Sequence, residues 1–150
     1  MADDLDTFLK GLSRFAKHLP AEEALPVELL VLRGHHLVEE ELREVVRAKF
    51  IKSKAYDLRE TKYSTLLRLA QALYGDEIPD WKWRVAHEVN VLRNSLAHHL
   101  EDETVEPRID RVCKLYRAND KDFAFVESTD LSRLAYCFAD LHTALLRLRT

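Results

Sequence analysis

The chain has 150 residues, of which 47% are hydrophobic and 33% are charged, and its formal net charge at pH 7 is −3. This length is the usual size of one domain, so we expect residues 1–150 to form a single domain around one hydrophobic core. The acidic balance argues against binding of duplex nucleic acid through one large basic face. Three glycines and four prolines are too few for the many turns of a β-sandwich, so the composition favours long helices.

Apolar residues at helical spacing predict an amphipathic helix from about Asp4 to Leu19, which ends at Pro20. A second, central helix is expected from about Pro26 to Lys52. A third is expected from about Tyr56 to Tyr74, with Gly75 as the favoured left-handed cap at its C-terminal end.

The fourth predicted helix begins near Asp80 and stops near Glu101. A fifth, shorter helix is expected around Pro107 to Arg117, and Phe123 to Val126 is predicted as a short strand or an extended tether. The last helix opens with Ser128 or Thr129 as its N-terminal cap. The pattern therefore predicts an all-α fold, an antiparallel helical bundle of about five to six helices.

The N-terminus is acidic and lacks the apolar stretch of a signal peptide, and no later apolar run approaches the roughly 20 residues of a membrane span. We therefore expect a cytoplasmic protein that has no membrane partner. Cys113 and Cys137 lie on separate predicted helices without CxxC spacing, which indicates two buried thiols. His35 and His36 are adjacent, which argues against a metal clamp made of i and i+4 ligands, and no metal site is expected.

Arg93 is predicted to lie at the edge of the apolar stripe of the fourth helix. A guanidinium at such a position needs partners, because burying an unpaired charge costs several kcal/mol. An ion pair with a carboxylate of the neighbouring helix is one explanation, and Glu41 is the obvious candidate. A bound phosphate and a contact across an interface are the alternatives.

The opposite side of the fourth helix carries a polar stripe made of His87, Asn94 and His98, with Asn90 at its border. Val91 lies within this stripe, where it is either a harmless exposed residue or part of a homodimer seam between two such helices. In that dimer, two copies of Arg93 and His98 would converge on one cleft. A histidine can move protons, while Arg and Asn side chains can hold phosphate oxygens. The segment Arg93–His98 is therefore a candidate RNA-cleaving or nucleotide-binding site.

Residues 89–100 read Val-Asn-Val-Leu-Arg-Asn-Ser-Leu-Ala-His-His-Leu. This segment resembles the signature of the HEPN superfamily (higher eukaryotes and prokaryotes nucleotide-binding), in which an Arg is followed by a polar residue, several variable residues and a His. Arg93, Asn94 and His98 occupy those three positions. The segment Arg33–Glu41 is similar to the long helix that precedes the motif in some members of the family.

The resemblance implies an α-helical bundle in which the motif lies near the end of a long helix and dimerisation joins two motifs. Many members of the family are metal-independent endoribonucleases, and others bind nucleotides or have lost catalysis, so the resemblance implies either an endoribonuclease without a cofactor or a nucleotide-binding module. Arg93 would then orient and neutralise the scissile phosphate, His98 would act as general base or acid, and Asn94 would position either the phosphate or His98. The supporting residues are His99, His87 and Glu41, with His99 as a second RNA contact or simply an exposed residue.

Two hypotheses from different classes follow. The first is a homodimeric HEPN-like endoribonuclease, a toxin or defence effector whose partners are RNA and an antitoxin-like protein. The second is a non-catalytic helical module that binds a nucleotide or a protein, in which Arg93 forms a structural ion pair with Glu41. Arg43, Arg47, Lys49, Lys52 and Lys54 form a basic run that either steers RNA or is merely a solvated face.

Overall fold

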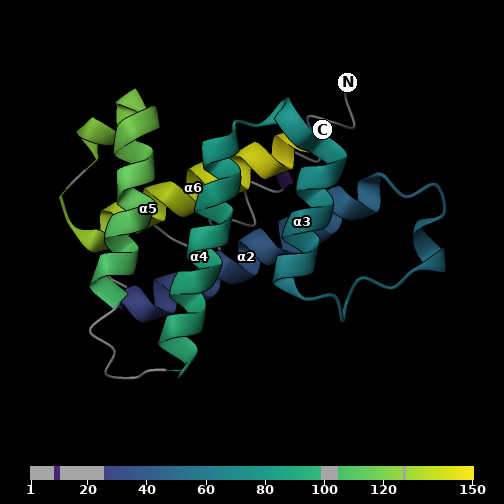
Figure 1. Cartoon of the computed structure of the whole chain (residues 1–150), viewed down its shortest axis with the longest axis horizontal. Coiled ribbons are helices and arrows are strands. Elements are labelled where there is room, and N and C mark those ends of the chain that lie inside the picture. Colours follow the sequence, from purple (N-terminus) through teal and green to yellow (C-terminus); the bar gives the residue numbers. More distant parts are fainter. Residues whose placement is uncertain (1–8, 11–25, 99–104, 127) are drawn as a thin grey trace.

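The computed structural model of the chain describes residues 9–10, 26–98, 105–126 and 128–150 (Figure 1). The α-helices within these ranges are α2 (Val27–Ala48), α3 (Tyr63–Tyr74), α4 (Asp80–His98), α5 (Val105–Asn119) and α6 (Asp130–Leu148). No strand occurs in the described ranges, so the expected all-α bundle is confirmed. The predicted helix from Asp4 to Leu19 lies outside the described residues, apart from residues 9–10.

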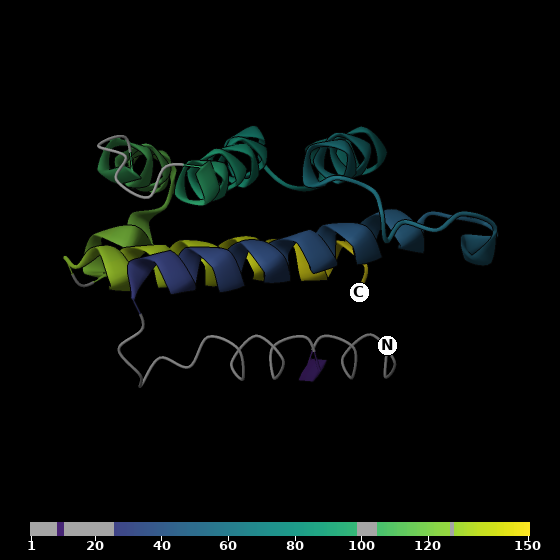
Figure 2. The same ribbon diagram turned by 90° about the horizontal axis from the view of Figure 1, so that it is seen from below.

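The five helices form two layers that cross at a steep angle (Figures 1 and 2). One layer contains α2 and α6, which run in the same direction, so that Gly34 faces Phe138 and Glu41 meets Arg149 further along both helices. The second layer contains α3, α4 and α5, and each of these helices is antiparallel to the one before it. The long helix α2 touches both layers, as the sequence predicted for a central helix.

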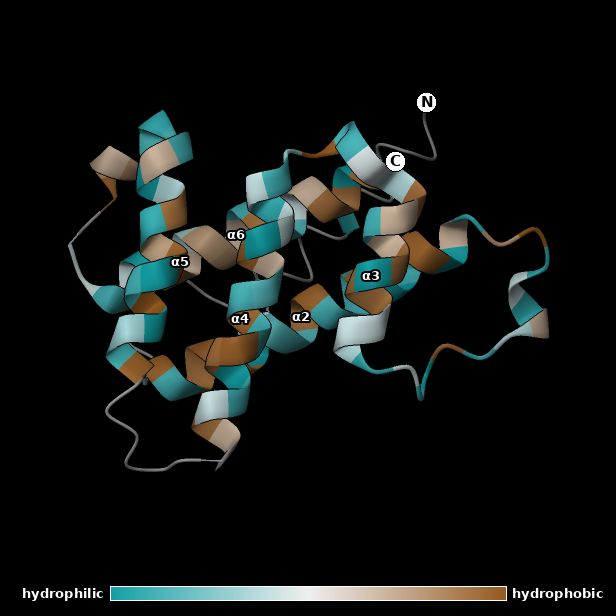
Figure 3. Cartoon of the chain, in the orientation of Figure 1, coloured by the Kyte–Doolittle hydropathy of each residue, from teal (hydrophilic) through white to brown (hydrophobic). Residues whose placement is uncertain are grey.

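Apolar residues at helical spacing fill the space between the layers. The stripe predicted for α2 is buried, and Val31, Val38, Leu42 and Val45 are all 0% exposed. Figure 3 shows hydrophobic and hydrophilic residues alternating along each labelled helix, as expected for amphipathic helices that cover one core. In the described part of the chain, no helix has both the length and the apolar character needed to cross a membrane.

Three buried tyrosines hold neighbouring helices together through their hydroxyl groups. Tyr63 of α3 donates to the carbonyl of Ala86 in α4 at 2.7 Å. Tyr74 of α3 donates to the carbonyl of Val45 in α2 at 2.6 Å, and Tyr116 of α5 donates to that of Cys137 in α6 at 3.0 Å. Each bond satisfies a hydroxyl that would otherwise be costly to bury, and each fixes the position of one helix against the next.

The caps of the helices agree with the sequence. Gly75 ends α3 as expected and its N–H bonds to the carbonyl of Gln71, but its φ of 48° and ψ of −115° are a positive-φ conformation other than the left-handed helical one. Thr129 is the N-cap of α6, where its side chain accepts a hydrogen bond from the N–H of Ser132. Cys113 and Cys137 are both buried and free, as expected for structural thiols.

Two predicted elements differ from the structure. The third helix begins at Tyr63 rather than Tyr56, because residues 49–62 contain only the short 3₁₀-helix Ser53–Ala55 and form a projecting segment. This segment is held at Leu58, which is 1% exposed and whose carbonyl accepts a hydrogen bond from Arg43 Nε at 3.0 Å. The helix α2 accordingly stops at Ala48, four residues before the predicted end.

The second difference concerns Phe123 to Val126, which form neither a strand nor an extended tether. Residues Lys121–Phe125 are a 3₁₀-helix, and Asp120 caps it by accepting a hydrogen bond from the N–H of Asp122. Phe123 is buried and packs against the aromatic rings of Tyr116 and Tyr136. The need to turn the chain directly from α5 into α6 therefore overrides the β-propensity of these apolar residues.

The substitution Gly34→Ala is expected to destabilise the fold by about 1–3 kcal/mol. A Cβ atom at this position would lie 2.6 Å from Cγ of Phe138, whose side chain is fully buried and has no space to move. The gain in helix propensity, roughly 1 kcal/mol, offsets only part of this cost. Urea unfolding measures the effect, with Arg33→Ala at the exposed neighbouring position as the control. Equal stability of the two variants would contradict the close approach of α2 and α6.

Candidate functional site

Arg93 and Asn94 line a polar pocket of about 580 Å³ at the end of α4. Its walls come from α2, from the start of α3 and from the last turns of α4. The lining residues are Leu32, His35, His36, Glu39, Lys62, Tyr63, Ser64, Asn90, Arg93 and Asn94. Lys62 and Arg93 outnumber the single carboxylate, that of Glu39, so with neutral histidines the pocket carries one net positive charge. Such a pocket suits an anionic ligand.

His35 and Asn90 form the innermost polar pair of this pocket. His35 Nε2 lies 2.9 Å from Asn90 Oδ1, which joins α2 to α4. The imidazole also stacks on the ring of Tyr63, with 4.4 Å between the ring centroids, and Tyr63 is itself fixed by its bond to Ala86. The pocket therefore has a rigid back wall made from three helices.

The pKa of His35 is lowered from its ordinary value of 6.5, mainly because burial disfavours the charged imidazolium. The bond to Asn90 and the charge of Glu39 act in the opposite direction, while the charge of Arg93 lowers the pKa further. At neutral pH His35 is therefore an uncharged imidazole. Because Asn90 Oδ1 is an acceptor, the proton of the neutral ring is assigned to Nε2 and the lone pair to Nδ1.

Arg93 does not pair with Glu41, so that expectation was wrong. Glu41 is 5% exposed, and its carboxylate accepts hydrogen bonds from two guanidinium nitrogens of Arg149 at the end of α6, from Nε and, at 3.2 Å, from Nη2. His142 Nε2 lies 3.7 Å from the same carboxylate. The parallel run of α2 and α6 carries Arg149 to this position, which faces α6 and not α4.

Arg93 is half-buried at the wall of the pocket. Its guanidinium lies 3.4 Å from the side-chain oxygen of the neighbouring Asn94, which is a long hydrogen bond. Among the residues that the structure describes, no carboxylate forms an ion pair with it. The hydrogen-bond donors of Arg93 are thus available to a ligand in the pocket.

The other predicted site residues are placed only in part. The backbone of His98 ends α4, one helical turn beyond Asn94, but its side chain and the whole of His99 lie outside the described part of the chain. Asn94 and His87 are both exposed, as the predicted polar stripe requires. His87 does not line the pocket of Arg93, however, but two neighbouring hollows along α4.

Sequence reasoning missed His35, Glu39, Lys62 and Ser64 as members of this pocket. A signal for His35 existed, because it follows Gly34 on the buried side of α2 and a buried polar residue needs partners. Glu39 lies four residues later and therefore on the same side of the helix. Lys62 and Ser64 gave no such signal, since the predicted helix from Tyr56 placed them mid-helix. In the described ranges, no three His, Cys, Asp or Glu residues are grouped as metal ligands.

The substitution Arg149→Ala is expected to cost about 1–3 kcal/mol of stability, because it leaves the buried carboxylate of Glu41 without its guanidinium partner. Arg93→Ala is expected to change the free energy of unfolding by no more than about 0.5 kcal/mol. Urea denaturation of the two variants provides the comparison. A larger loss of unfolding free energy for Arg93→Ala than for Arg149→Ala would show that Arg93 has a structural role.

Lowering the pH is expected to destabilise the protein through His35. The unfolded chain protonates this histidine near pH 6.5, whereas the folded chain does so only at a lower pH. Between the two values the unfolded state binds more protons, so stability falls as the pH drops below about 6.5 and this contribution levels off below the folded pKa. Nuclear magnetic resonance titration should give a midpoint below 6.5 for His35, and His35→Gln should weaken the acid destabilisation. A midpoint above 6.5 would refute the buried neutral imidazole.

Comparison of the chain with protein-family models, with curated proteins and with solved structures finds no match. The functional interpretation therefore depends on the chemistry of the pocket and on the motif at Arg93, Asn94 and His98.

Proposed function

We propose that the chain is a metal-independent endoribonuclease of the HEPN type, with Arg93, Asn94 and His98 as its site. The observation that carries the proposal is the placement of Arg93 in an open polar pocket while Arg149 occupies the carboxylate of Glu41. The structural ion pair expected for Arg93 is thus made by Arg149 instead. An arginine that faces a pocket with its donors available is suited to hold a phosphate group.

The proposed reaction needs no group beyond the side chains of the site. The 2′-hydroxyl of a ribose loses its proton to a base and its oxygen attacks the adjacent phosphorus. The bond from phosphorus to the 5′-oxygen breaks, and this leaving oxygen takes a proton from an acid. The products are a 2′,3′-cyclic phosphate and a 5′-hydroxyl. Arg93 neutralises the charge that develops on the phosphate oxygens, and His98 supplies or accepts a proton.

Two proton transfers favour a homodimer, because each chain contributes one His98 at the end of α4. We propose that the last two turns of α4, from the half-buried Val91 to the end of the helix, form the seam, and that the preceding turns around Arg84 lie outside it. The resemblance places such dimers in toxin–antitoxin or defence systems. An antitoxin-like protein is then the partner that keeps the enzyme inactive.

The second candidate is a non-catalytic module that binds a nucleotide. The volume of the pocket favours it, since about 580 Å³ lies within the range of roughly 300–1,000 Å³ that is usual for small-molecule sites. In this case Arg93 and Lys62 bind the phosphate groups. Asn90 and Asn94 offer amide groups that can hydrogen-bond a base or ribose.

Cleavage of single-stranded RNA in the presence of EDTA tests the first candidate. We expect Arg93→Ala and His98→Ala each to lower the rate at least about 100-fold, because each removes charge stabilisation or proton transfer. Arg117→Ala, at an exposed position of α5, serves as the control that removes the same charge elsewhere. Circular dichroism and sedimentation show whether fold and dimer are intact. Unchanged cleavage by both variants would exclude the site, and nucleotide binding without cleavage by the wild type would select the second candidate.

A further inference from the structure

Two more hollows flank α4 on its outward side, away from α2 and α6. One, of about 550 Å³, lies between α3 and α4, and the other, of about 430 Å³, lies between α4 and α5. Arg84 and His87 belong to the lining of both. The two hollows are therefore neighbours that are separated only by the ridge of α4.

The first of these hollows adjoins the pocket of Arg93. Ser64 and Asn90 line both, so the three concavities follow one another along and across α4. Arg84 precedes Arg93 by nine residues, which corresponds to roughly 14 Å along a helix. A ligand that reached from the α4–α5 hollow to Arg93 would have to be an extended chain and not a single small molecule.

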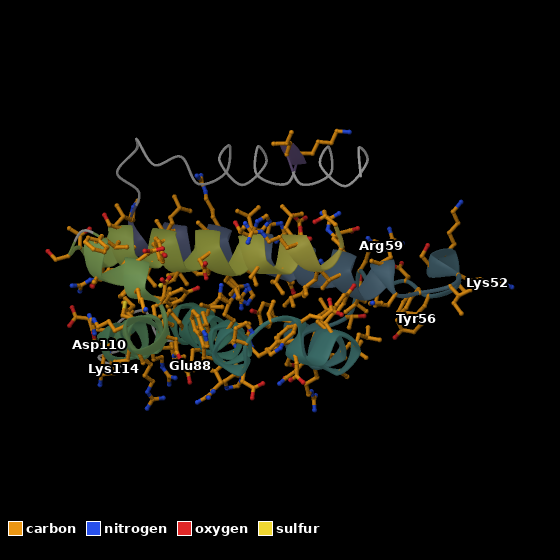
Figure 4. All side chains as sticks on the ribbon, turned by 90° about the horizontal axis from the view of Figure 1, so that it is seen from above. Lys52, Tyr56, Arg59, Glu88, Asp110 and Lys114 are labelled. Atoms are coloured by element: carbon orange, nitrogen blue, oxygen red, sulfur yellow. The ribbon has the colours of Figure 1, made fainter. Side chains whose placement is uncertain are left out.

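Positive charge is concentrated along this path. The two hollows are lined by the cations Arg68, Arg84, Arg111 and Lys114 and by the carboxylates of Asp80 and Glu88. Four positive and two negative charges give a local net charge of +2, whereas the whole chain carries −3. Lys114 projects from the outward side of the α3–α4–α5 layer (Figure 4). This charge excess favours an anionic partner.

The four cations are also unpaired within the described part of the chain. All four side chains are exposed, and none forms an ion pair with a described carboxylate, although Lys82 on the inward side of α4 is paired with Asp140 at 2.9 Å. The fold therefore does not depend on ion pairs of these four side chains. They are available to phosphate groups.

The hollows have apolar surface as well as charge. Leu67 and the buried Trp83 line the hollow between α3 and α4, and Trp83 is fixed by a hydrogen bond of 3.0 Å from its Nε1 to the carbonyl of Gly75. Leu115 and Ala118 line the hollow between α4 and α5. Apolar patches next to unpaired cations suit a strand that has exposed bases and a phosphate backbone.

We propose that this outward side of α4 is a track that binds the backbone of single-stranded RNA and leads it to the pocket of Arg93. The inference rests on the proposed function and extends it by assigning the substrate form and four binding residues: Arg68, Arg84, Arg111 and Lys114. A single strand fits better than a duplex, because separate hollows accept splayed bases and the basic area is small. An acidic protein segment would satisfy the cations but would leave the apolar linings without bases.

Binding of a fluorescently labelled 12-nucleotide single-stranded RNA to the non-cleaving His98→Ala protein, measured by anisotropy at several salt concentrations, tests the track. Adding Arg84→Gln and Arg111→Gln is expected to weaken binding roughly tenfold and to reduce the slope of log K against log salt by about 1.4, which corresponds to two phosphate contacts. The matched control adds Arg33→Gln and Lys121→Gln, which remove the same charge at exposed positions that line neither hollow. Equal effects of the two pairs, or no effect of the first pair, would overturn the proposal.

Failure of the track and failure of the proposed function give different results. If the wild type cleaves RNA but both double variants bind it alike, the site stands and the track is wrong. If His98→Ala binds RNA through Arg84 and Arg111 but the wild type cleaves nothing, the track stands and the endoribonuclease assignment is wrong. Equal competition by poly-glutamate or by duplex RNA of the same charge would also overturn the assignment to single-stranded RNA.

Discussion

The buried carboxylate of Glu41 determines what Arg93 is able to do. Glu41 is 5% exposed on the central helix α2, so it must have a cationic partner, and Arg149 provides one from the end of α6. This pairing is possible because α2 and α6 run in the same direction and approach closely where Gly34 faces Phe138. With the carboxylate satisfied inside one layer, the guanidinium of Arg93 in the other layer has no structural ion pair among the described residues and lines a pocket instead.

The helix α4 has two different sides, one that packs on the core and one that lines hollows at the surface. Its inward side packs on α2 and α6 and carries the fully buried residues Val85, Ala86, Val89 and Leu92. Its outward side lines two hollows that share Arg84 and His87, and Arg93 lines the polar pocket between α4, α2 and the start of α3. The hydrogen bond from His35 to Asn90 fixes this helix against α2 at the point where the hollows meet. The proposed catalysis and the proposed binding of an extended strand would therefore use one rigid element.

Much of the fold follows from local sequence patterns, and the exceptions have a common cause. Periodic apolar residues and two caps, Gly75 and Thr129, predict the C-terminal end of α3 and the start of α6 because these signals act within a few residues. The partner of Glu41 was not predictable, since Arg149 lies 108 residues away and only the packing of α6 on α2 joins them. The pocket shows the same limit: the motif identified Arg93 and Asn94, whereas His35 entered it through tertiary contacts with Asn90 and Tyr63. Residues 49–62 are held to the bundle at Leu58, whose carbonyl accepts a hydrogen bond from Arg43, and apolar spacing does not reveal this contact.

The pocket of Arg93 is proposed to cleave RNA by internal attack of a 2′-hydroxyl. The most direct measurement is the chemical identity of the ends that the protein leaves on a defined single-stranded RNA, read by mass spectrometry. The account predicts fragments with a 2′,3′-cyclic phosphate and a 5′-hydroxyl, and no cleavage where the attacking ribose is replaced by a 2′-deoxyribose. Fragments with a 5′-phosphate, or cleavage that persists at the 2′-deoxy position, would contradict it.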